Sequence, residues 1–319
     1  MTDKEKYEVL EKENNCLPVF LQTWWLDIVC NKSWNVFLEE KKGRILYAFP
    51  YFVCKKKIFT SVIPPLLSPC CGAYIDYSDC KSLSEQYSLE NRASENFAAF
   101  IKKLNLDNFV YTLRPESFFS MGFYWLGFTS KVRYTFRIDI SEKDLFFKNF
   151  HKALRKSIKD ASKILTFSYA EGETLTAYNI LKQTYDRQKT EIPYTFTLFD
   201  NLVKSAEERK QGKLFFAKDQ SEKINGVIFI VWDKTIAYNL IGGIADDCLQ
   251  NDVMAFLTYN AMLYCNDLGL KIFDMEGSMI KGVEHHFRLY NGKRYPYLEI
   301  SKKPSVFFSL ARGIKKLIK

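Results

Sequence analysis

The sequence has few of the residues that build metal centres and disulfide frameworks. It contains three histidines and eight cysteines in 319 residues, and no two cysteines form a C-x-x-C pair. We therefore expect free thiols in a reducing compartment. His285 and His286 are adjacent, and on a helix they would point about 100° apart. This arrangement argues against a shared metal ion, so we expect one histidine on a helix surface and the other nearer a cleft, with no metal site.

Long apolar segments are also missing. No apolar run approaches the about 18 residues that a membrane-spanning helix requires. The opening stretch MTDKEKYEVLEKENN is charged and lacks the apolar core of a secretory signal. We expect a cytoplasmic protein on these grounds.

Aromatic and basic residues are abundant. Hydrophobic residues make up 47% of the chain and aromatic residues 16%, which is enough for one large or two medium cores. Lysine and arginine number 46 against 37 acidic residues, a formal charge of +9. This excess suits an anionic partner such as a phosphate, tRNA or a membrane surface, without choosing among them.

The order of hydrophobic patterns indicates an α/β (α+β) fold. Each half reads as a helix, a β-meander, a helix and a strand, and the turn KKG at 41–43 predicts a hairpin. We predict an N-terminal domain over 1–140, a linking basic helix over 141–163, and a C-terminal domain over 164–319 that closes with a basic amphipathic helix. That last helix is expected to pack on the protein, with docking at the membrane interface as the alternative.

Single residues predict where several helices begin and end. Thr23, Ser88 and Asn251 are expected to cap helix N-termini, and Gly212 and Gly269 to follow helix C-termini. Trp24 and Trp25, just after Thr23, are expected to be core residues rather than a stacking platform.

Several segments, taken in order, resemble a known family. They are "FLQTWWLDIVC", "LRKSIKDASK", "INGVIFIVWDKTIAYNLIGGI", "NDVMAFLTYNAMLYCNDLGLKIFDMEGS" and "GVEHHFRLYNGKRYPYLEI". Together they resemble the FemAB-like group of GNAT acyltransferases, which includes the peptidoglycan bridge-forming aminoacyltransferases. The resemblance covers both halves and implies two tandem GNAT-like domains with mixed, mostly antiparallel sheets. It also implies transfer of an acyl group to an amine.

The resemblance leaves the acyl donor open. In the Fem enzymes the donor is aminoacyl-tRNA and the acceptor a peptidoglycan precursor, but the helical arm of many tRNA-dependent members is not visible here. The loop "ADDCLQNDV", residues 245–253, also places two acids where a coenzyme A pyrophosphate would need free amides. We expect no tightly bound cofactor, and a donor that is aminoacyl-tRNA or another acyl carrier; acetyl-CoA is not supported.

Two carboxylates are the candidate catalytic residues. Asp274 and Glu276 are two apart on a predicted strand, so they would share one face at the end where α/β sheets bind ligands. Either could take the proton of an attacking amine. The alternative is that Asp274 and Ser278 only cap the next helix.

Six other residues are candidates for substrate binding. Arg155 and Lys159 are four apart on one basic helical face that suits phosphates, although a simply solvated face is the alternative. The full set is Arg155, Lys159, Arg187, Asn239, Ser278 and Arg288.

We therefore expect an acyl- or aminoacyltransferase that acts on an amine, such as one on a cell-wall precursor. Its partners would be an anionic donor or acceptor, with tRNA among the candidates. The alternative is a non-catalytic GNAT-like protein that binds nucleic acid or membrane phosphates through its basic face.

Overall fold

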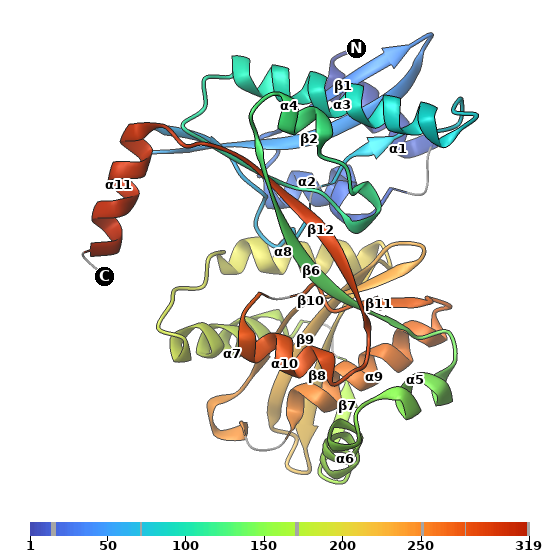
Figure 1. The fold of residues 1–319 in the computed structure, drawn as a ribbon. Helices are drawn as coiled ribbons and strands as arrows, with labels where there is room; N and C mark the ends of the chain where they lie inside the picture. Colours follow the sequence, from blue (N-terminus) through green and yellow to red (C-terminus); the bar gives the residue numbers. More distant parts are fainter. Residues whose placement is uncertain (14–16, 71, 170–171, 250–251, 278, 318–319) are drawn as a thin grey trace. The chain divides into compact units, whose positions relative to one another are not determined.

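The computed structural model describes residues 1–13, 17–70, 72–169, 172–249, 252–277 and 279–317, without the side chains beyond residue 311. The chain divides into two compact units, residues 1–133 with 296–319, and residues 134–295 (Figure 1). Segment 141–163, expected as a linker, belongs to the second unit, and 296–319 belongs to the first. That each unit is a GNAT-like domain stays a prediction.

The first unit combines a mixed sheet with helices. Its helices are α1 (Asp3–Glu13), η1 (Val19–Leu21), α2 (Thr23–Val29), α3 (Leu83–Lys103), η2 (Pro115–Ser117), α4 (Met121–Trp125) and α11 (Val306–Leu317). Its strands are β1 (Trp34–Lys41), β2 (Arg44–Lys56), β3 (Phe59–Val62), β4 (Tyr74–Ile75), β5 (Asn108–Thr112) and most of β12 (Lys293–Lys302). The strand order is β1-β2-β3-β5-β12, and β4 pairs with β2. Lys42 and Gly43 have positive φ angles, as a two-residue hairpin turn requires, so the expected hairpin is confirmed.

Aromatic side chains fill the first unit. Phe97 of α3 stacks on Phe49 of β2 with ring centroids 4.5 Å apart. Trp24 and Trp25 are buried, and the indole N–H of Trp25 donates to the Ser68 hydroxyl. Both tryptophans are therefore core residues, as expected.

The second unit has its own mixed sheet. Its helices are α5 (Lys143–Asn149), α6 (Lys152–Ala161), α7 (Thr174–Arg187), α8 (Phe196–Glu208), η3 (Asp246–Cys248), α9 (Val253–Asp267) and α10 (Lys281–Arg288). Its strands are β6 (Thr129–Asp139, entering from the first unit), β7 (Leu165–Ser168), β8 (Gly212–Asp219), β9 (Ile224–Trp232), β10 (Ile236–Ile244) and β11 (Ile272–Asp274). The order is β6-β11-β10-β9-β8-β7, antiparallel except for β10 with β11. The expected α/β class with a mixed, mostly antiparallel sheet is confirmed.

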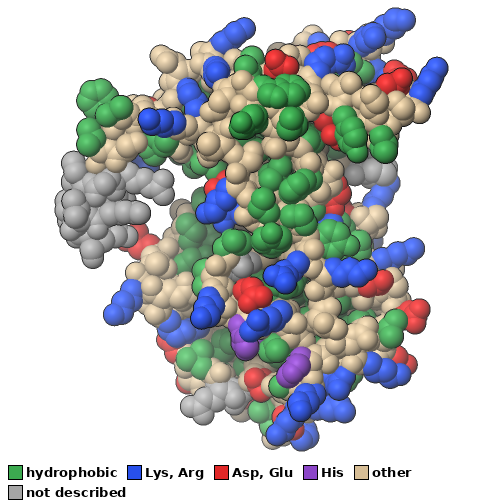
Figure 2. All heavy atoms as spheres, in the orientation of Figure 1, with side chains coloured by type: hydrophobic (Ala, Val, Ile, Leu, Met, Phe, Trp, Pro, Cys, Tyr) green, Lys and Arg blue, Asp and Glu red, His purple; other side chains and the backbone are tan. Residues whose placement is uncertain are grey.

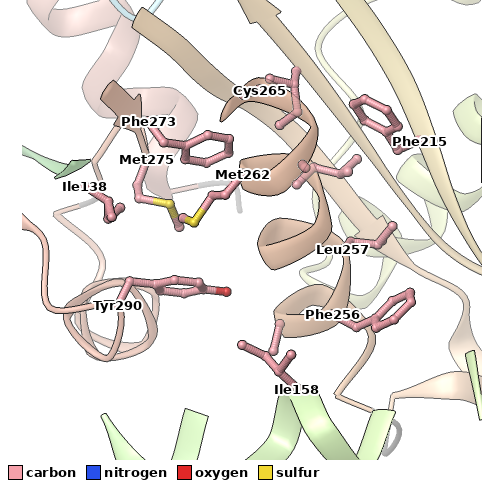
Figure 3. Close-up of a cluster of buried hydrophobic side chains, with 14 of the residues drawn as sticks. Ile138, Ile158, Phe215, Phe256, Leu257, Met262, Cys265, Phe273, Met275 and Tyr290 are labelled. Atoms are coloured by element: carbon pink, nitrogen blue, oxygen red, sulfur yellow. The ribbon is translucent and has the colours of Figure 1, made fainter. Parts of the chain in front are cut away.

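Strand β9 is apolar from Val227 to Trp232 because helices cover both of its faces there. Phe229 packs against Phe199 of α8, whereas Ile228 and Ile230 belong to the core around α9. Figure 3 shows that core, with Met262 of α9 facing Phe273 and Met275 from β11 and the residue after it. This cover accounts for the continuous apolar run.

The two units have a similar order of elements, and the last strand of each series belongs to the sheet of the other unit. A three-stranded meander, a helix, a strand and a short helix precede β6, and a similar series precedes β12. Strand β6 leaves the first unit and pairs with β11, while β12 leaves the second unit and pairs with β5. The sheet of each unit thus includes a strand that comes, along the chain, after the elements of the other unit.

The expected single basic helix over 141–163 is wrong, because two helices, α5 and α6, occupy this segment. Phe150 and His151, between α5 and α6, have extended backbone with ψ angles of 151° and 142°. Phe150 is buried, and the His151 N–H donates to the Leu289 carbonyl over 2.8 Å. The burial of Phe150 and the hydrogen bond from His151 to Leu289 stabilise an extended backbone here, so the helix is interrupted.

The expected caps Thr23 and Ser88 are wrong. Helix α2 has Gln22 as its N-cap, so Thr23 is its first helical residue. Helix α3 begins at Leu83, where the Ser82 hydroxyl accepts from the Glu85 N–H, and Ser88 therefore lies inside the helix. The serine-x-x-glutamate pattern at Ser82 is a capping-box sequence that the sequence analysis overlooked.

The glycine and asparagine predictions have mixed outcomes. Gly269, with φ +84°, follows α9, and its N–H donates to the Asn266 carbonyl, as expected of a C-terminal glycine. Lys210, with φ +56°, takes that place after α8. Gly212 starts β8, where a Cβ would lie 2.7 Å from the Ala206 Cβ. Asn251 lies outside the described residues, and Asp252 is the N-cap of α9.

Candidate active site at the end of strand β11

Two parallel strands of the second unit separate at the candidate site. Strands β10 and β11 pair from Ile236–Tyr238 to Ile272–Asp274, and β11 then ends. The Met275 N–H donates to the Phe136 carbonyl, so the chain stays with β6 after β11. Strand β10 continues along β9 to Ile244, with a register shift between Asn239 and Ile241. Within the described chain, β10 has no strand partner on its β11 side beyond Tyr238.

Asp274 is a buried and fully engaged carboxylate. It is 3% exposed and accepts hydrogen bonds from the Thr135 hydroxyl, the Arg137 Nε at 2.7 Å and the Glu276 N–H at 2.8 Å. The cap alternative is wrong for Asp274, because α10 has Ile280 as its N-cap and no side-chain cap bond. Ser278 lies outside the described residues. Asp274 therefore organises the backbone after β11.

Arg137 is the counter-ion of Asp274 and was missed by the sequence analysis. It lies directly opposite Asp274 in the β6–β11 ladder, and Thr135 is two residues away on the same strand. The Tyr295 ring lies 5.1 Å from the guanidinium carbon of Arg137. The available signal was an arginine between the apolar residues Phe136 and Ile138, because charged residues are seldom buried in a strand without a partner.

Glu276 is placed differently from Asp274. It was expected on the same strand face, but β11 ends at Asp274 and Glu276 has a φ angle of +56°. Its side chain is half-buried, and Oε1 is shielded from solvent without a hydrogen-bond partner among the described residues. A shielded carboxylate oxygen without a donor is uncommon in structural sites.

Gly277 explains why the strand end has this form. It is the second consecutive residue with left-handed backbone, with φ +59°. A Cβ at this position would lie 2.0 Å from the Tyr134 carbonyl oxygen and 2.7 Å from the Thr135 Cα. Only glycine fits this close approach to β6, which fixes the position of the adjoining Glu276.

The two carboxyl groups have different electrostatic surroundings. Burial raises the pKa of Asp274, while Arg137 and the hydrogen bonds to its carboxylate oppose that rise. The pKa of Glu276 is raised well above its ordinary value by burial and by the negative charge of Asp274. Glu276 thus has a proton affinity suited to transfer nearer to neutral pH.

The basic helix α6 supplies one engaged and one exposed cation. The guanidinium of Arg155 donates to the Lys148 carbonyl at the end of α5. Lys159 is exposed. Arg155 thus helps to join two helices, and phosphate binding by either residue stays a prediction.

Arg187 lies at the far end of β10 from the β10–β11 pairing. It pairs with Asp246 and donates to the Ile244 carbonyl over 2.9 Å. Asp247, the second acid of this loop, pairs with Lys223. The loop is therefore tied to its own surroundings by ion pairs.

The remaining candidates, Asn239 and Arg288, make no contact with Glu276 that the described residues show. Asn239 lies at the register shift of β10, near the point where the strands separate. Arg288 is exposed on α10, with its guanidinium 2.6 Å from His285 Nδ1. His285 is exposed, as expected for one of the pair, while His286 is half-buried beside Tyr290. Burial lowers the pKa of His286.

The described part of the chain has neither a cluster of metal-binding side chains nor a helix that could span a membrane. Among these residues, no group of three or more histidine, cysteine, aspartate or glutamate side chains is arranged to hold a metal ion. No helix within the same residues is long and apolar enough to cross a bilayer.

Comparison with known proteins identifies a domain type in the second half of the chain and similar folds. No curated protein matches the chain in sequence. Residues 148–288 match the model of the acetyltransferase (GNAT) domain. The solved structure of FemX is 11% identical, with a TM-score of 0.68 over 93% of this chain and 96% of that one.

Two further solved structures are similar. L-PGS from Bacillus licheniformis is 13% identical, with a TM-score of 0.60 over 97% of this chain and 95% of that one. The C-terminal domain of a putative lysylphosphatidylglycerol synthetase from Agrobacterium fabrum is 13% identical, with a TM-score of 0.54 over 87% and 90%. At such identities these likenesses report the fold. Residues 148–288 are thus similar to the acetyltransferase (GNAT) domain, and the chain has the fold that its resemblance to the FemAB-like group predicted.

Proposed function

We propose that the protein transfers an acyl or aminoacyl group to an amine, and that Glu276 handles the proton of that amine. The observation that carries the proposal is the unlike pair of carboxyl groups at the end of β11. Asp274 has three hydrogen-bond donors, whereas Glu276 has a shielded oxygen that receives no hydrogen bond from the residues that the structure describes. Of the two, Glu276 is the one free to exchange a proton with a substrate.

The chemistry follows from these positions. The amine nitrogen forms a bond to the acyl carbonyl carbon while the ester C–O or thioester C–S bond of the donor breaks. The proton lost by the amine passes to the Glu276 carboxylate, and the leaving oxygen or sulfur takes a proton. Because the pKa of Glu276 is raised, its carboxylate is a stronger base than an exposed glutamate.

The open side of β10 is a place for the acyl donor. Beyond Tyr238 the strand has backbone groups on the side where β11 no longer runs. Amide N–H groups there can stabilise the oxyanion that develops on the acyl carbonyl. The resemblance to the Fem enzymes favours an aminoacyl donor and an amine on a cell-wall precursor.

Glu276→Gln tests the proposal directly. Purified protein is assayed for transfer from charged tRNA and from acyl thioesters to amine acceptors, cell-wall precursor peptides among them. We expect the variant to lose about 100-fold or more of kcat, since general base catalysis contributes on that scale. Glu173→Gln directly before α7, also half-buried in the second unit, is the matched control and should retain activity.

The rate of transfer should also change with pH in the wild type. The rate should rise with pH as Glu276 loses its proton, and this rise should be absent from the residual activity of Glu276→Gln. Unchanged transfer in Glu276→Gln would contradict the assignment of this residue. An inactive wild type that still binds phosphates through Arg155 and Lys159 would favour the non-catalytic alternative.

A further inference from the structure

Helix α11 is anchored by Ser305, the residue directly before its first residue, Val306. The Ser305 hydroxyl donates to the Asp107 Oδ1 over 2.9 Å, and the Ser305 N–H donates to the Asp107 carbonyl over 2.8 Å. Ser305 also caps the helix, because its hydroxyl accepts from the Phe308 N–H. The direction in which α11 leaves the first unit is thus set by Asp107.

The same aspartate binds β3 directly after the turn between β2 and β3. The Thr60 N–H donates to the Asp107 Oδ2 over 2.9 Å, and Phe59 packs edge-on against Phe308 at 5.3 Å between ring centroids. The turn and the start of α11 are therefore adjacent parts of one structure. Both lie in the first unit.

Large apolar side chains at this place point into solvent. Ile58 in the turn is 85% exposed, and Val306, Phe307 and Leu310 on α11 are 71%, 76% and 59% exposed. Of the described apolar side chains of α11, Phe308 is the half-buried one. In the described part of the helix the apolar residues are thus not packed on the protein as a terminal core helix would be.

Lysines border these apolar side chains. Three exposed lysines directly precede Ile58: Lys55 and Lys56 at the end of β2, and Lys57 in the turn. Lys303, also exposed, precedes α11. Figure 2 shows hydrophobic side chains over the start of α11 with lysine and arginine side chains beside them. We call this set the basic apolar tip; its members are Lys55, Lys56, Lys57, Ile58, Lys303, Val306, Phe307 and Leu310.

We propose that the basic apolar tip docks on an anionic lipid surface. The apolar side chains enter the boundary between headgroups and acyl chains, while the lysines contact lipid phosphates. Two elements held together by Asp107 present both kinds of side chain in a fixed arrangement, which lowers the entropy lost on binding. The proposal stands without the proposed catalytic function, because no residue of the second unit takes part.

The mixture of side chains favours lipid over nucleic acid. Phosphates of RNA or DNA are recognised by basic and polar groups, and single-stranded bases stack on aromatic rings. The exposed aliphatic side chains of the tip, Ile58, Val306 and Leu310, can neither bind phosphates nor stack on bases. Aliphatic side chains are, however, stabilised when they move from water into an acyl-chain layer. A tip of this composition is therefore fitted to a membrane.

Flotation of the full chain with vesicles tests the proposal. The wild type should bind vesicles of phosphatidylcholine with phosphatidylglycerol, and binding should fall with phosphatidylcholine alone or at high salt. The double variant Ile58→Asp/Phe307→Asp should bind about tenfold or more weakly. The control Leu175→Asp, at a site 54% exposed on α7, should bind as the wild type does.

A second variant set separates charge from apolar insertion. Lys55→Gln/Lys56→Gln/Lys57→Gln should weaken binding about fivefold for each lysine, the ratio that about 1 kcal/mol gives. The exposed triple control Lys102→Gln/Lys103→Gln/Lys131→Gln should have a smaller effect. Circular dichroism confirms that each variant is folded.

Three results would overturn the proposal. They are no vesicle binding by the folded wild type at low salt, equal binding by Ile58→Asp/Phe307→Asp, and self-association through the tip in sedimentation velocity. Transfer activity that survives in the double variant with soluble substrates would leave the proposed function intact, so the two proposals fail separately.

Discussion

Arg137 and Asp274 form a buried ion pair across two antiparallel strands, with Arg137 Nε 2.7 Å from Asp274 Oδ2. The arginine side chain is 9% exposed and the aspartate side chain 5%. Little water reaches either charge, so the two opposite charges stabilise each other. The pair fixes the last residue of β11, and through the Glu276 N–H it fixes the residue that we propose to be catalytic.

Asp274→Asn should lower the free energy of unfolding by about 3–5 kcal/mol, because it leaves the guanidinium of Arg137 buried without its counter-charge. Chemical denaturation monitored by circular dichroism measures the change. The double variant Arg137→Met/Asp274→Leu should recover much of the loss, since it removes both charges. A double variant no more stable than Asp274→Asn would contradict this account.

Glu276→Gln should change how stability depends on pH. The pKa of Glu276 in the folded protein is raised above its ordinary value of 4.5, so the native state keeps a proton that the unfolded chain releases. The contribution of this group is complete below pH 4.5 and is lost as the pH rises toward the raised pKa. The variant should lose this downward slope in denaturation series across that range, and the exposed control Glu191→Gln should keep it.

Gly277→Ala should disrupt the end of β11, because its Cβ would meet the Tyr134 carbonyl oxygen in a left-handed backbone conformation. We expect a loss of at least about 2 kcal/mol in unfolding free energy, together with loss of transfer activity. Gly282→Ala is a matched control inside α10, where a Cβ would meet no atom within 4 Å. It should stabilise the protein by about 0.5–1 kcal/mol. Equal effects of both substitutions on thermal unfolding would show that Gly277 is not sterically required.

Arg155→Ala should cost about 1 kcal/mol of stability, because it removes the bond from Arg155 to the Lys148 carbonyl. Lys159→Ala should change stability by less than about 0.5 kcal/mol, since this side chain is exposed. Lys159 is therefore the better probe of anion binding by α6. Titration of each variant with tRNA and with inorganic phosphate separates a binding defect from a folding defect.

The sequence predicted the order of the helices and strands better than it predicted the residues at which they begin and end. The periodicity of the β9 and α9 segments was strong enough to identify both elements. Gly269 was correctly placed because a residue with positive φ angle favours glycine. Gly212 was wrongly predicted to end α8. A glycine is needed there because of the close contact with Ala206, and Lys210 is the residue with a left-handed backbone after α8.

The candidate site could be predicted only in part, for a similar reason. The motif at 273–278 drew attention to Asp274 and Glu276, but the partner of Asp274 is 137 residues earlier in the chain. Pairing between β6 and β11 is a non-local contact that no local pattern encodes. The different environments of the two carboxyl groups follow from that pairing and from the backbone turn at Glu276 and Gly277.

The exchange of strands has a consequence for synthesis on the ribosome. The sheet of the first unit contains β12, which is translated after every element of the second unit. During elongation β5 therefore waits with one edge unpaired while the second unit emerges. The N-terminal half should reach its final stability only when residues 296–302 leave the exit tunnel, although most of its chain has been made long before.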